Sequence, residues 1–497
     1  MSRWITLSFS LVLAACSSAG IGDRNAESVA PVTVVAEQLS AESNKASNVQ
    51  NVDLKSGPPL IPPVGAALST QPNANLGPAK MCEGAITHTD RVKIPPVAKP
   101  PFGRYYKDPA FGSRVIRITD GEFGEVNKPA YSTMQAWNAD ESLMLLYRGG
   151  NKNGFHVLHD GHTYEPIKKL DIVPSDLEEV YWSHTDPDAF YYVSKYSRDL
   201  GHFKKYSVRA GKAKKIADFG KYCGFKGVPT GGNDVHMQSM DDDTFGFRCR
   251  NDDGTFVMFN YKLSTGATSV QSIGDGTNWQ PWTAPATAPS GKRYFYQGKV
   301  LSADLKTVEH TLDMYKSSEH SNIGLTHNGQ DALYQVAFND SPKGCNGDLW
   351  KGVGHLVEHN LETGACRPII SEAHGYPYTT SSTHASARAH LRPGWVAMSS
   401  IGHLEQLEFF TNKRPAPALL SEVYLANTDP GDPVTCRLAH HRSYGKMAKQ
   451  GGYPPYFGEP HATISPSGTR IVFGSDWYDS GSVDSYVIEL PGYRKPR

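Results

Sequence analysis

The feature that most constrains the fold is a strand–turn–strand unit that recurs through most of the chain. Each copy has a short run rich in β-branched and aromatic residues, a tight turn, and a second run of the same kind. The turns lie at residues 138–141, 184–188, 287–291, 325–329 and 461–468. Many of them end in Gly, which tolerates the positive φ that such turns require. With helical periodicity nearly absent, this spacing predicts an all-β repeat architecture.

The turn sequence identifies a more specific resemblance. Ser465-Pro-Ser-Gly468 resembles the SPDG turn between the first two strands of TolB-type β-propeller blades, and the likeness extends over residues 113–490. Units start near seven positions, which implies a seven-bladed propeller: Ser132, Val180, Asp234, Trp282, Ser318, Thr383 and Glu459. We expect strand 114–119 to complete the last blade beside 485–490 and close the ring. A long sandwich or a right-handed β-helix is the alternative.

The first residues predict export. Arg3 precedes a short apolar run, and Leu13-Ala-Ala-Cys16 resembles the lipobox of bacterial lipoproteins. We therefore expect a signal peptide at 1–15, acylation of Cys16, and a flexible tether rich in Ala, Ser, Pro and Asn at 16–101. The seven-bladed propeller then occupies 102–497. The expected location is the cell envelope, anchored to the outer membrane, with the cell surface as one option because the leaflet stays open.

Charge limits the kinds of partner that we expect, and the cysteines indicate candidate disulfides. The chain has 50 Lys and Arg against 50 Asp and Glu, so its net charge gives no reason to expect nucleic-acid binding. We expect a monomer that contacts a membrane through its lipid anchor. An exported chain can form disulfides, and Cys345 with Cys366 flank one predicted strand pair. Cys223 with Cys249 is a second candidate pair, and the absence of CxxC argues against a structural zinc knuckle.

The innermost strands of a propeller line its central channel, so residues at their ends are candidates for a site. Five of the seven predicted units carry a His there, and we expect these five to share one mouth: His184, His236, His320, His384 and His461. The ends of the second strands carry cations in the first four units: Arg148, Lys195, Arg248 or Arg250, and Lys299. This pattern predicts a positive half-rim that binds an anionic ligand such as a uronate or a sulfated sugar.

A propeller of this kind resembles the propeller-type polysaccharide lyases. The run Glu459-Pro-His461-Ala-Thr-Ile-Ser-Pro-Ser-Gly468 is similar to the HPHPSF-SPDG run of oligogalacturonate lyases. In that family the paired His, with a His of another blade, hold Mn²⁺. His461 matches the second of the pair, and Glu459 replaces the first with another possible ligand. His320-Ser-Asn322 resembles a further family run, but the family's THEFW histidine has no counterpart in the matching stretch at Trp282.

The resemblance implies roles for these residues. His320, His384 and His461 become candidate ligands of one divalent ion, namely manganese, calcium or zinc. Ulvan lyases, which are exported propellers, use His or Tyr as acid and base and an Arg against the uronate carboxylate. This likeness makes His156 and His184 a possible acid–base pair. The base would be His184 or His236, and Arg250 would neutralise the uronate carboxylate. Arg148, Lys195, Arg248 and Lys299 are the expected substrate-binding residues.

Two functions follow as hypotheses. The first is an exported lyase that cleaves a uronate-containing, ulvan-like polysaccharide by β-elimination. The second is a TolB-like module that binds an envelope partner without catalysis. The several His favour an enzyme, because binding alone does not need them. A Ser hydrolase is disfavoured because no nucleophile-elbow motif is present, while a glycosidase carboxylate pair stays open.

Overall fold

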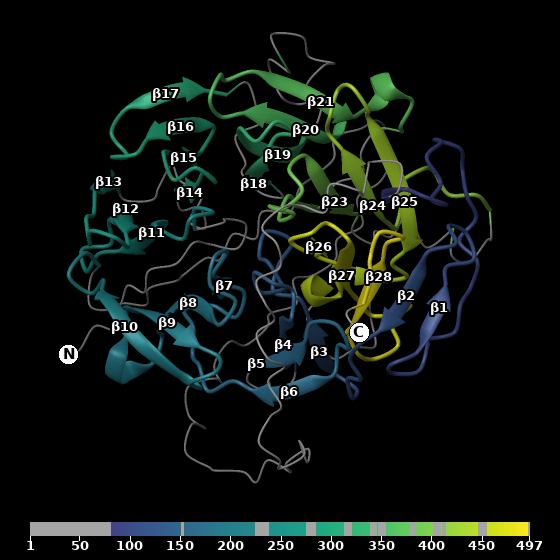
Figure 1. Cartoon of the computed structure of the whole chain (residues 1–497), viewed down its shortest axis with the longest axis horizontal. Coiled ribbons are helices and arrows are strands. Elements are labelled where there is room, and N and C mark those ends of the chain that lie inside the picture. The colour runs from purple at the N-terminus through teal and green to yellow at the C-terminus, as the bar shows by residue number, and fades with distance from the viewer. Residues whose placement is uncertain are drawn as a thin grey trace, which may run out of the picture. The chain divides into compact units, whose positions relative to one another are not determined.

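The computed structural model describes residues 81–150, 154–223, 238–274, 285–312, 321–337, 345, 354–377, 384–400, 409, 414–445 and 455–495. Seven antiparallel sheets follow one another around a ring, with the first strand of each sheet toward the centre (Figure 1). The chain is therefore the predicted seven-bladed β-propeller. Among the described residues, none forms a helix with the length and apolarity that a membrane span requires.

The blades follow the order of the sequence. Blade one holds β3 (Glu125–Lys128), β4 (Leu143–Gly150), β5 (Phe155–Asp160) and β6 (Pro166–Lys169). Blade two holds β7 (Tyr181–Trp182), β8 (Ala189–Val193), β9 (His202–Ser207) and β10 (Lys212–Asp218). Blade three holds β11 (Thr244–Arg250), β12 (Phe256–Lys262) and β13 (Val270–Gly274). Blade four holds β14 (Ala286–Thr287), β15 (Arg293–Tyr296), β16 (Lys299–Ser302) and β17 (Val308–Thr311).

The second half continues in the same way. Blade five holds β18 (Asn322–Leu325), β19 (Asp331–Ala337), β20 (Gly354–Asn360) and β21 (Cys366–Ile370). Blade six holds β22 (His384–Ser386), β23 (Trp395–Ser399), β24 (Glu422–Asn427) and β25 (Val434–His440). Blade seven holds β26 (Thr463–Ile464), β27 (Arg470–Ser475) and β28 (Asp484–Glu489).

The ring closes through a strand from the N-terminal side of the propeller. β2 (Arg114–Arg117) pairs antiparallel with β28, with Arg114 opposite Glu489 and Arg117 opposite Tyr486. β1 (Tyr105–Lys107) adds outside β2, so blade seven is a five-stranded sheet. The prediction that strand 114–119 pairs beside 485–490 is thus confirmed. The hydrogen bonds of this pairing join strands from both ends of the propeller in one blade.

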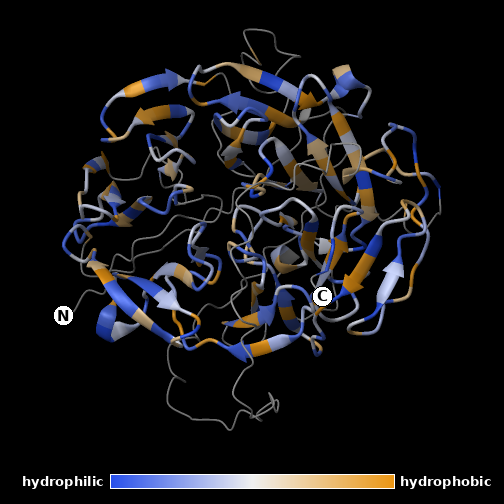
Figure 2. Ribbon diagram, in the orientation of Figure 1, coloured by the Kyte–Doolittle hydropathy of each residue, from blue (hydrophilic) through white to orange (hydrophobic). Residues whose placement is uncertain are grey.

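The core lies between neighbouring blades. Central strands such as β8 (AFYYV) and β27 (RIVFGS) are buried along their whole length, and apolar stretches recur in the inner strands of most blades (Figure 2). Aromatic rings fill the space between blades two and three. Phe203 packs against Phe219 and Phe245, with ring centroids 5.5 and 4.9 Å away. Such contacts add to the hydrophobic stabilisation that holds adjacent sheets together.

The predicted turns have the expected backbone. Gly291, Gly329 and Gly468 adopt φ values of 68°, 84° and 76°. Two units depart from this pattern, because Glu141 of the first takes φ 59° and Asp242 of the third takes φ 61° where three other units have Gly. The Glu141 carboxylate bonds the buried guanidinium of Arg470 in blade seven, with 2.6 Å between Oε2 and Nη2. This ion pair compensates for the unfavourable left-handed backbone and joins the first blade to the last.

Residues 81–101, the end of the predicted flexible tether, are folded against blades six and seven. Met81 and Ile94 are fully buried, and Ile86 forms a β-bridge with Arg437. Farther along, Trp477 Nε1 donates to Val97 O at 2.9 Å. The tether boundary at residue 101 is therefore wrong, because this segment buries apolar side chains and satisfies backbone groups on the propeller. We call residues 81–101 the strap.

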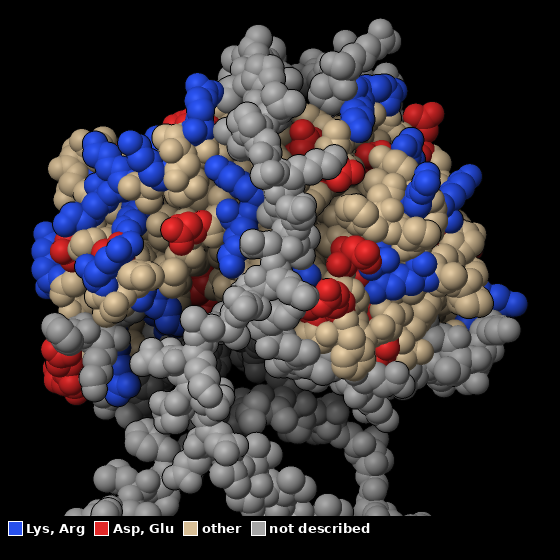
Figure 3. All heavy atoms as spheres, turned by 90° about the horizontal axis from the view of Figure 1, so that it is seen from below, with Lys and Arg blue, Asp and Glu red and all other residues tan. Residues whose placement is uncertain are grey.

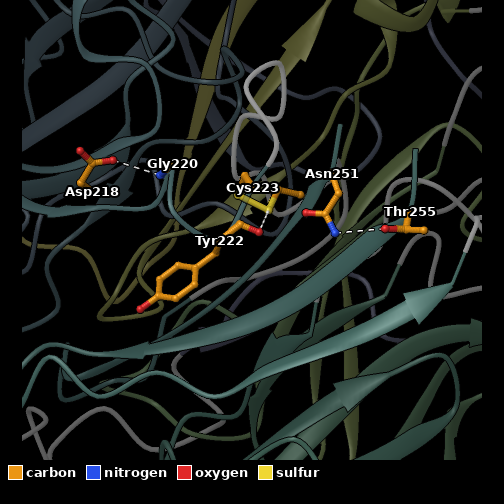
Figure 4. Close-up of a disulfide and its surroundings, with 7 residues drawn as sticks. Asp218, Gly220, Tyr222, Cys223, Asn251 and Thr255 are labelled. Atoms are coloured by element: carbon orange, nitrogen blue, oxygen red, sulfur yellow. Dashed lines mark hydrogen bonds between the residues drawn. A yellow bond between two sulfur atoms is a disulfide. The ribbon is translucent and has the colours of Figure 1, made fainter. Parts of the chain in front are cut away.

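Three disulfides join the described cysteines. Cys223–Cys249 and Cys345–Cys366 confirm the two predicted pairs, each closing a short loop of 26 and 21 residues. Figure 4 shows Cys223–Cys249, where Cys249 Sγ also contacts the carbonyl oxygen of Tyr222 at 3.7 Å. The third bond, Cys82–Cys436, spans 354 residues and fastens the strap to β25. Each bond restricts the unfolded chain and so stabilises the fold.

Three buried histidines predict a loss of stability in acid. Burial lowers the pKa of His156, His159 and His359 to about 4, below the value near 6.5 expected in the unfolded chain. A lowered folded-state pKa gives stability that is complete above about pH 6.5 and is lost as the pH falls toward 4. We expect the Tm to fall steadily over this range in thermal unfolding experiments.

A single substitution tests the cause. His159 Nδ1 lies 3.0 Å from the carbonyl oxygen of Tyr164, and the Asn amide can donate the same bond without titrating. His159→Asn should therefore have a shallower decline of Tm with pH than the wild type. A wild-type Tm that stays flat between about pH 6.5 and 4 would contradict the prediction.

Candidate metal centre

Three buried side chains meet at the start of the innermost strands of blades six and seven. His384 opens β22, while Glu459 and His461 lie between η6 (Pro455–Gly458) and β26. Glu459 Oε2 is 3.4 Å from His461 Nε2 and 3.9 Å from His384 Nε2. One ligand atom from each residue lies within 4.8 Å of the other two. Together they form a compact group that we call the metal centre.

The local backbone turns His461 toward this group. His461 has φ 44°, a left-handed conformation that is unfavourable for a residue with a Cβ. The next residues are tied to neighbouring blades. Ala462 N donates to Ser399 Oγ at 3.2 Å, and Thr463 Oγ1 donates to the carbonyl oxygen of Tyr131 at 3.0 Å. Backbone strain held by such contacts is a common property of functional sites.

Lys128, the last residue of β3, supports the metal centre from blade one. Its Nζ donates to the carbonyl oxygen of Glu459 at 2.7 Å and lies 2.8 Å from His461 Nδ1. Burial lowers the pKa of Lys128 to about 8, against the opposing effect of Glu178 and Glu459. Because Nδ1 is engaged by Lys128, the nitrogen of His461 that faces Glu459 is Nε2. Such outer contacts fix the orientation of a ligand ring.

Aromatic rings enclose the two imidazoles. The Tyr131 ring centroid lies 5.1 Å from that of His384 and 4.4 Å from that of His461. Tyr456 approaches His461 to 5.0 Å, and its hydroxyl lies 3.0 Å from both carboxylate oxygens of Glu178. Side chains from blades one, six and seven, and Glu178 from the connection between blades one and two, thus surround the metal centre.

The donor set fits a divalent transition-metal ion. Two imidazole nitrogens and one carboxylate oxygen suit Mn²⁺ or Zn²⁺, whereas Ca²⁺ takes oxygen ligands almost exclusively. Three protein ligands leave coordination positions open for water or a substrate oxygen. Of the predicted metal ligands, the structure brings together His384 and His461, and it adds Glu459. His320 lies outside the described residues.

The structure places His184 elsewhere. It follows β7 in the turn to β8, where its Nδ1 lies 3.2 Å from Asp242 Oδ1 and its ring contacts His390 at 5.1 Å. His390 comes after β22, whereas His384 begins that strand. His184 therefore lies at the other end of the innermost strands, and the prediction that it shares a mouth with His384 and His461 is wrong. The turn motif marks where a strand ends, so reading from it confuses the two ends when the strand is only two residues long.

Of the other two candidate acid–base residues, His156 and His236, the structure describes only His156. His156 is 1% exposed, and its Nε2 lies 2.7 Å from the carbonyl oxygen of Leu177. With its pKa lowered to about 4 by burial, it is neutral and holds the connection between blades one and two. His236 lies outside the described residues.

The predicted cations are not equivalent. Arg148 forms an ion pair with Glu125, and Lys195 and Lys299 are exposed. Arg248 is 8% exposed, and burial lowers its pKa to about 10 while Glu179 opposes the shift. Arg250 is exposed, with its guanidinium 5.8 Å from the centroid of the Phe256 ring. Arg248 is thus the buried cation of the predicted half-rim.

One register also differs from the prediction. Lys299 opens β16, the third strand of blade four, and does not end the second strand β15.

The largest gathering of Lys and Arg at the left of Figure 3 lies over β9 and β10, on the outer edge of blade two. These strands read HFKKYS and KAKKIAD, and charged edge strands of this kind resist unwanted pairing with other chains.

Sequence reasoning missed Lys128, Tyr131, Tyr456 and Glu178. The innermost strand of blade one is interrupted between β3 and the bridge of Trp137 to Met144, so its first part had no turn motif nearby. The apolar and polar run Glu125-Val-Asn-Lys128, just before the first unit, is the signal that places Lys128 on an inner strand. Tyr456 and Glu178 lie in connections between blades, where strand periodicity gives no information.

Comparisons with known proteins agree with this fold. No family model and no curated protein sequence matches the chain. Among solved structures, an oligogalacturonate lyase in complex with manganese matches with a TM-score of 0.54 at 14% identity, covering 82% of this chain and 99% of the other. An oligogalacturonate lyase from Vibrio parahaemolyticus gives 0.51 at 12% identity, with 82% and 99% covered.

A third match is to TolB from Acinetobacter baumannii, with a TM-score of 0.32 at 12% identity, covering 74% of this chain and 64% of the other. The two lyase matches span nearly the whole of the other chains and show a shared propeller fold. The stretch at Trp282, which matches the THEFW run of the lyase family, has no histidine. In this structure the histidine that lies beside Glu459 and His461 is His384, from blade six.

Proposed function

We propose that this protein is a metal-dependent lyase that cleaves a uronate-containing, ulvan-like polysaccharide by β-elimination. The observation that carries the proposal is the buried group of His384, Glu459 and His461. The shared fold with oligogalacturonate lyases, one of them in complex with manganese, supports it. In this group His384 and His461 would each supply one nitrogen, and Glu459 one oxygen.

The reaction removes the proton α to the uronate carboxylate and breaks the bond to the 4-linked sugar oxygen, which takes up a proton. A double bond forms between the two ring carbons. A bound divalent cation would supply a positive charge against the carboxylate, which stabilises the negative charge that develops as the proton leaves. Protein groups then have to bind the chain, orient it and exclude water.

The described residues fit these tasks. Tyr131 and Tyr456 pack on the imidazole rings and would limit the access of bulk solvent to the metal centre. Lys128 holds His461 through Nδ1, and its contact to the Glu459 backbone fixes the segment that carries both ligands. Arg248 is a buried cation that would bind the carboxylate of a neighbouring sugar.

We further propose that the protein works outside the cytoplasm, lipidated at Cys16 and held at the outer membrane as a monomer. Three disulfides support this location, because such bonds persist mainly in oxidising compartments. An anchored enzyme at the cell envelope would meet polymers. Mass spectrometry of the protein from bacterial membranes would detect the acyl chains on Cys16.

The activity is tested with the purified full chain. Ulvan, polygalacturonate and an uncharged polysaccharide are each mixed with the enzyme in the presence of Mn²⁺ or of a chelator, and the ultraviolet absorbance of the unsaturated uronate is followed. We expect a signal with a uronate polymer and Mn²⁺ only. An absence of signal with every uronate polymer, in a protein that has bound Mn²⁺, would contradict the proposed reaction.

The role of Lys128 can be tested through metal binding alone, without an activity assay. Lys128→Met removes the group that holds His461 Nδ1 but keeps the apolar stem, so Mn²⁺ affinity should fall by about 10- to 100-fold. Calorimetric titration with Mn²⁺ measures this change without a substrate. Lys214→Met, on the outer strand β10, is the matched control and should bind Mn²⁺ as the wild type does. An unchanged affinity in Lys128→Met would show that Lys128 does not position the ligand.

A further inference from the structure

Arg388 is a buried cation for which no carboxylate partner is found among the described residues. It lies just after β22 and is 2% exposed. Its Nε donates to Asn322 Oδ1 at 3.2 Å, and its Nη2 has no hydrogen-bond partner. Three other buried arginines each have an acidic partner: Arg437 with Glu422, Arg442 with Asp108, and Arg470 with Glu141. Arg388 stands apart from them in this respect.

Asn322, the first residue of β18, presents a second donor beside Arg388. Its Oδ1 accepts from Ala387 N and from Arg388 Nε, both at 3.2 Å. Because both contacts come from N–H donors, the amide orientation is fixed and the other atom is Nδ2. Asn322 is 2% exposed, and its Nδ2 has no partner either. Two buried donors and one buried positive charge therefore lie close together, and the part of the chain that the structure describes offers them no acceptor.

A buried charge and two buried donors without partners are costly, and an anion would satisfy all three. We propose that Arg388 Nη2 and Asn322 Nδ2 bind a small monovalent anion in the channel wall between blades five and six. The Nε and Nη2 edge of a guanidinium is the edge that binds anions in a forked geometry, and Asn322 occupies only its Nε end. The anion site goes beyond the proposed lyase activity and does not depend on it.

The fold holds this site rigidly and apart from the metal centre. A Cβ on Gly324 would lie 2.5 Å from the Ala387 Cβ, so glycine there lets the inner strands of blades five and six approach closely. Gln135 Nε2 donates to the carbonyl oxygens of Arg388 and Ile464, at 3.1 and 3.0 Å, and fixes the backbone from blade one. His384 begins β22, whereas Arg388 lies two residues beyond its end, so the two residues flank opposite ends of this strand.

Two sources provide an anion of this chemistry: a halide from solution, or a carboxylate such as that of a single uronate. Thermal unfolding of the full chain distinguishes them. Chloride, bromide, acetate or galacturonate is titrated at constant ionic strength, with galactose as the uncharged comparison. We expect a saturable rise in Tm of roughly 2 °C at tenfold excess over Kd with at least one anion. Arg388→Met should lose this rise, while Arg392→Met, a change at a partly buried arginine nearby, should keep it.

Crystals grown with bromide provide a test that needs no variant. Anomalous scattering should place bromide between Arg388 Nη2 and Asn322 Nδ2 if the halide is the ligand, and a galacturonate complex should show the carboxylate there if it is not. A rise in Tm that persists unchanged in Arg388→Met, an equal rise with galactose, or an empty site in both crystals would overturn the proposal. Because none of these readouts is enzymatic, failure of the lyase assay leaves the test intact.

Discussion

Replacing His384 by Ala is expected to lower the affinity for Mn²⁺ by roughly 100-fold or more and to abolish uronate elimination. This loss exceeds the loss of about 10- to 100-fold in metal affinity that is typical when a residue supporting a ligand is replaced. His384 is the one ligand of the metal centre that comes from blade six, and it is fully buried. Without it, only Glu459 and His461 remain, two residues apart on a single segment. A divalent ion held by two protein ligands exchanges readily with water, so both binding and the charge against the uronate carboxylate are lost.

The measurement combines Mn²⁺ titration calorimetry with the absorbance assay on a uronate polymer. His374→Ala is the matched control, since this exposed histidine lies in η3 (Glu372–His374) of the loop after β21 and should change neither value. Circular dichroism and Tm establish that His384→Ala is folded. If a folded His384→Ala variant binds Mn²⁺ like the wild type, His384, Glu459 and His461 do not form the metal site, and the proposed function loses its basis.

Replacing Glu422 by Gln is expected to destabilise the protein by about 3–5 kcal/mol. Glu422 and Arg437 are fully buried in β24 and β25 and form a two-pronged ion pair, with 2.9 Å from Nε to Oε2 and 2.6 Å from Nη2 to Oε1. The same guanidinium donates through Nη1 to the strap, to the carbonyl oxygen of Asp90 at 2.7 Å. Gln leaves the arginine charge buried without a counter-charge, which is the costly outcome for such pairs.

Chemical denaturation measures the free energy of unfolding of this variant. The double variant Glu422→Leu with Arg437→Met removes both charges and keeps apolar volume, so it should recover much of the loss, although it gives up the bonds to the strap. If Glu422→Gln unfolds at the same denaturant concentration as the wild type, the ion pair does not contribute the predicted stability. Metal binding should be unaffected in both variants, because the pair lies away from the innermost strands.

Much of the fold followed from the sequence because propeller blades leave a local signature. The turn at 465–468 and its relatives predicted the number of blades, and strand 114–119 predicted the closure with β28. Cys223–Cys249 and Cys345–Cys366 were predictable because the two cysteines of each pair are close in the sequence, 26 and 21 residues apart. Cys82–Cys436 was not, because a bond across 354 residues depends on the path of the strap over the folded propeller.

The site was predicted in part. His384, Glu459 and His461 each lie at the start of an innermost strand, so the repeat itself brought them into consideration. Their selection from the other histidines needed three-dimensional register, which fails for His184 because its strand has only two residues. Lys128 and Arg388 could not be assigned from type alone, since most lysines and arginines of a propeller lie on its surface.

The closure through β2 has a consequence for how the protein is made. β2 leaves the ribosome more than 360 residues before its partner β28, so the hydrogen bonds between the two strands cannot form until the whole propeller has been synthesised. Until then the nascent protein has an open edge strand, and the contacts that complete it span more than 360 residues. Contacts of such high sequence separation slow folding and favour domain swapping and aggregation of the unfinished chain. Removing β2 or removing β28 should therefore impair folding in the same way, because each change leaves the other strand without its partner.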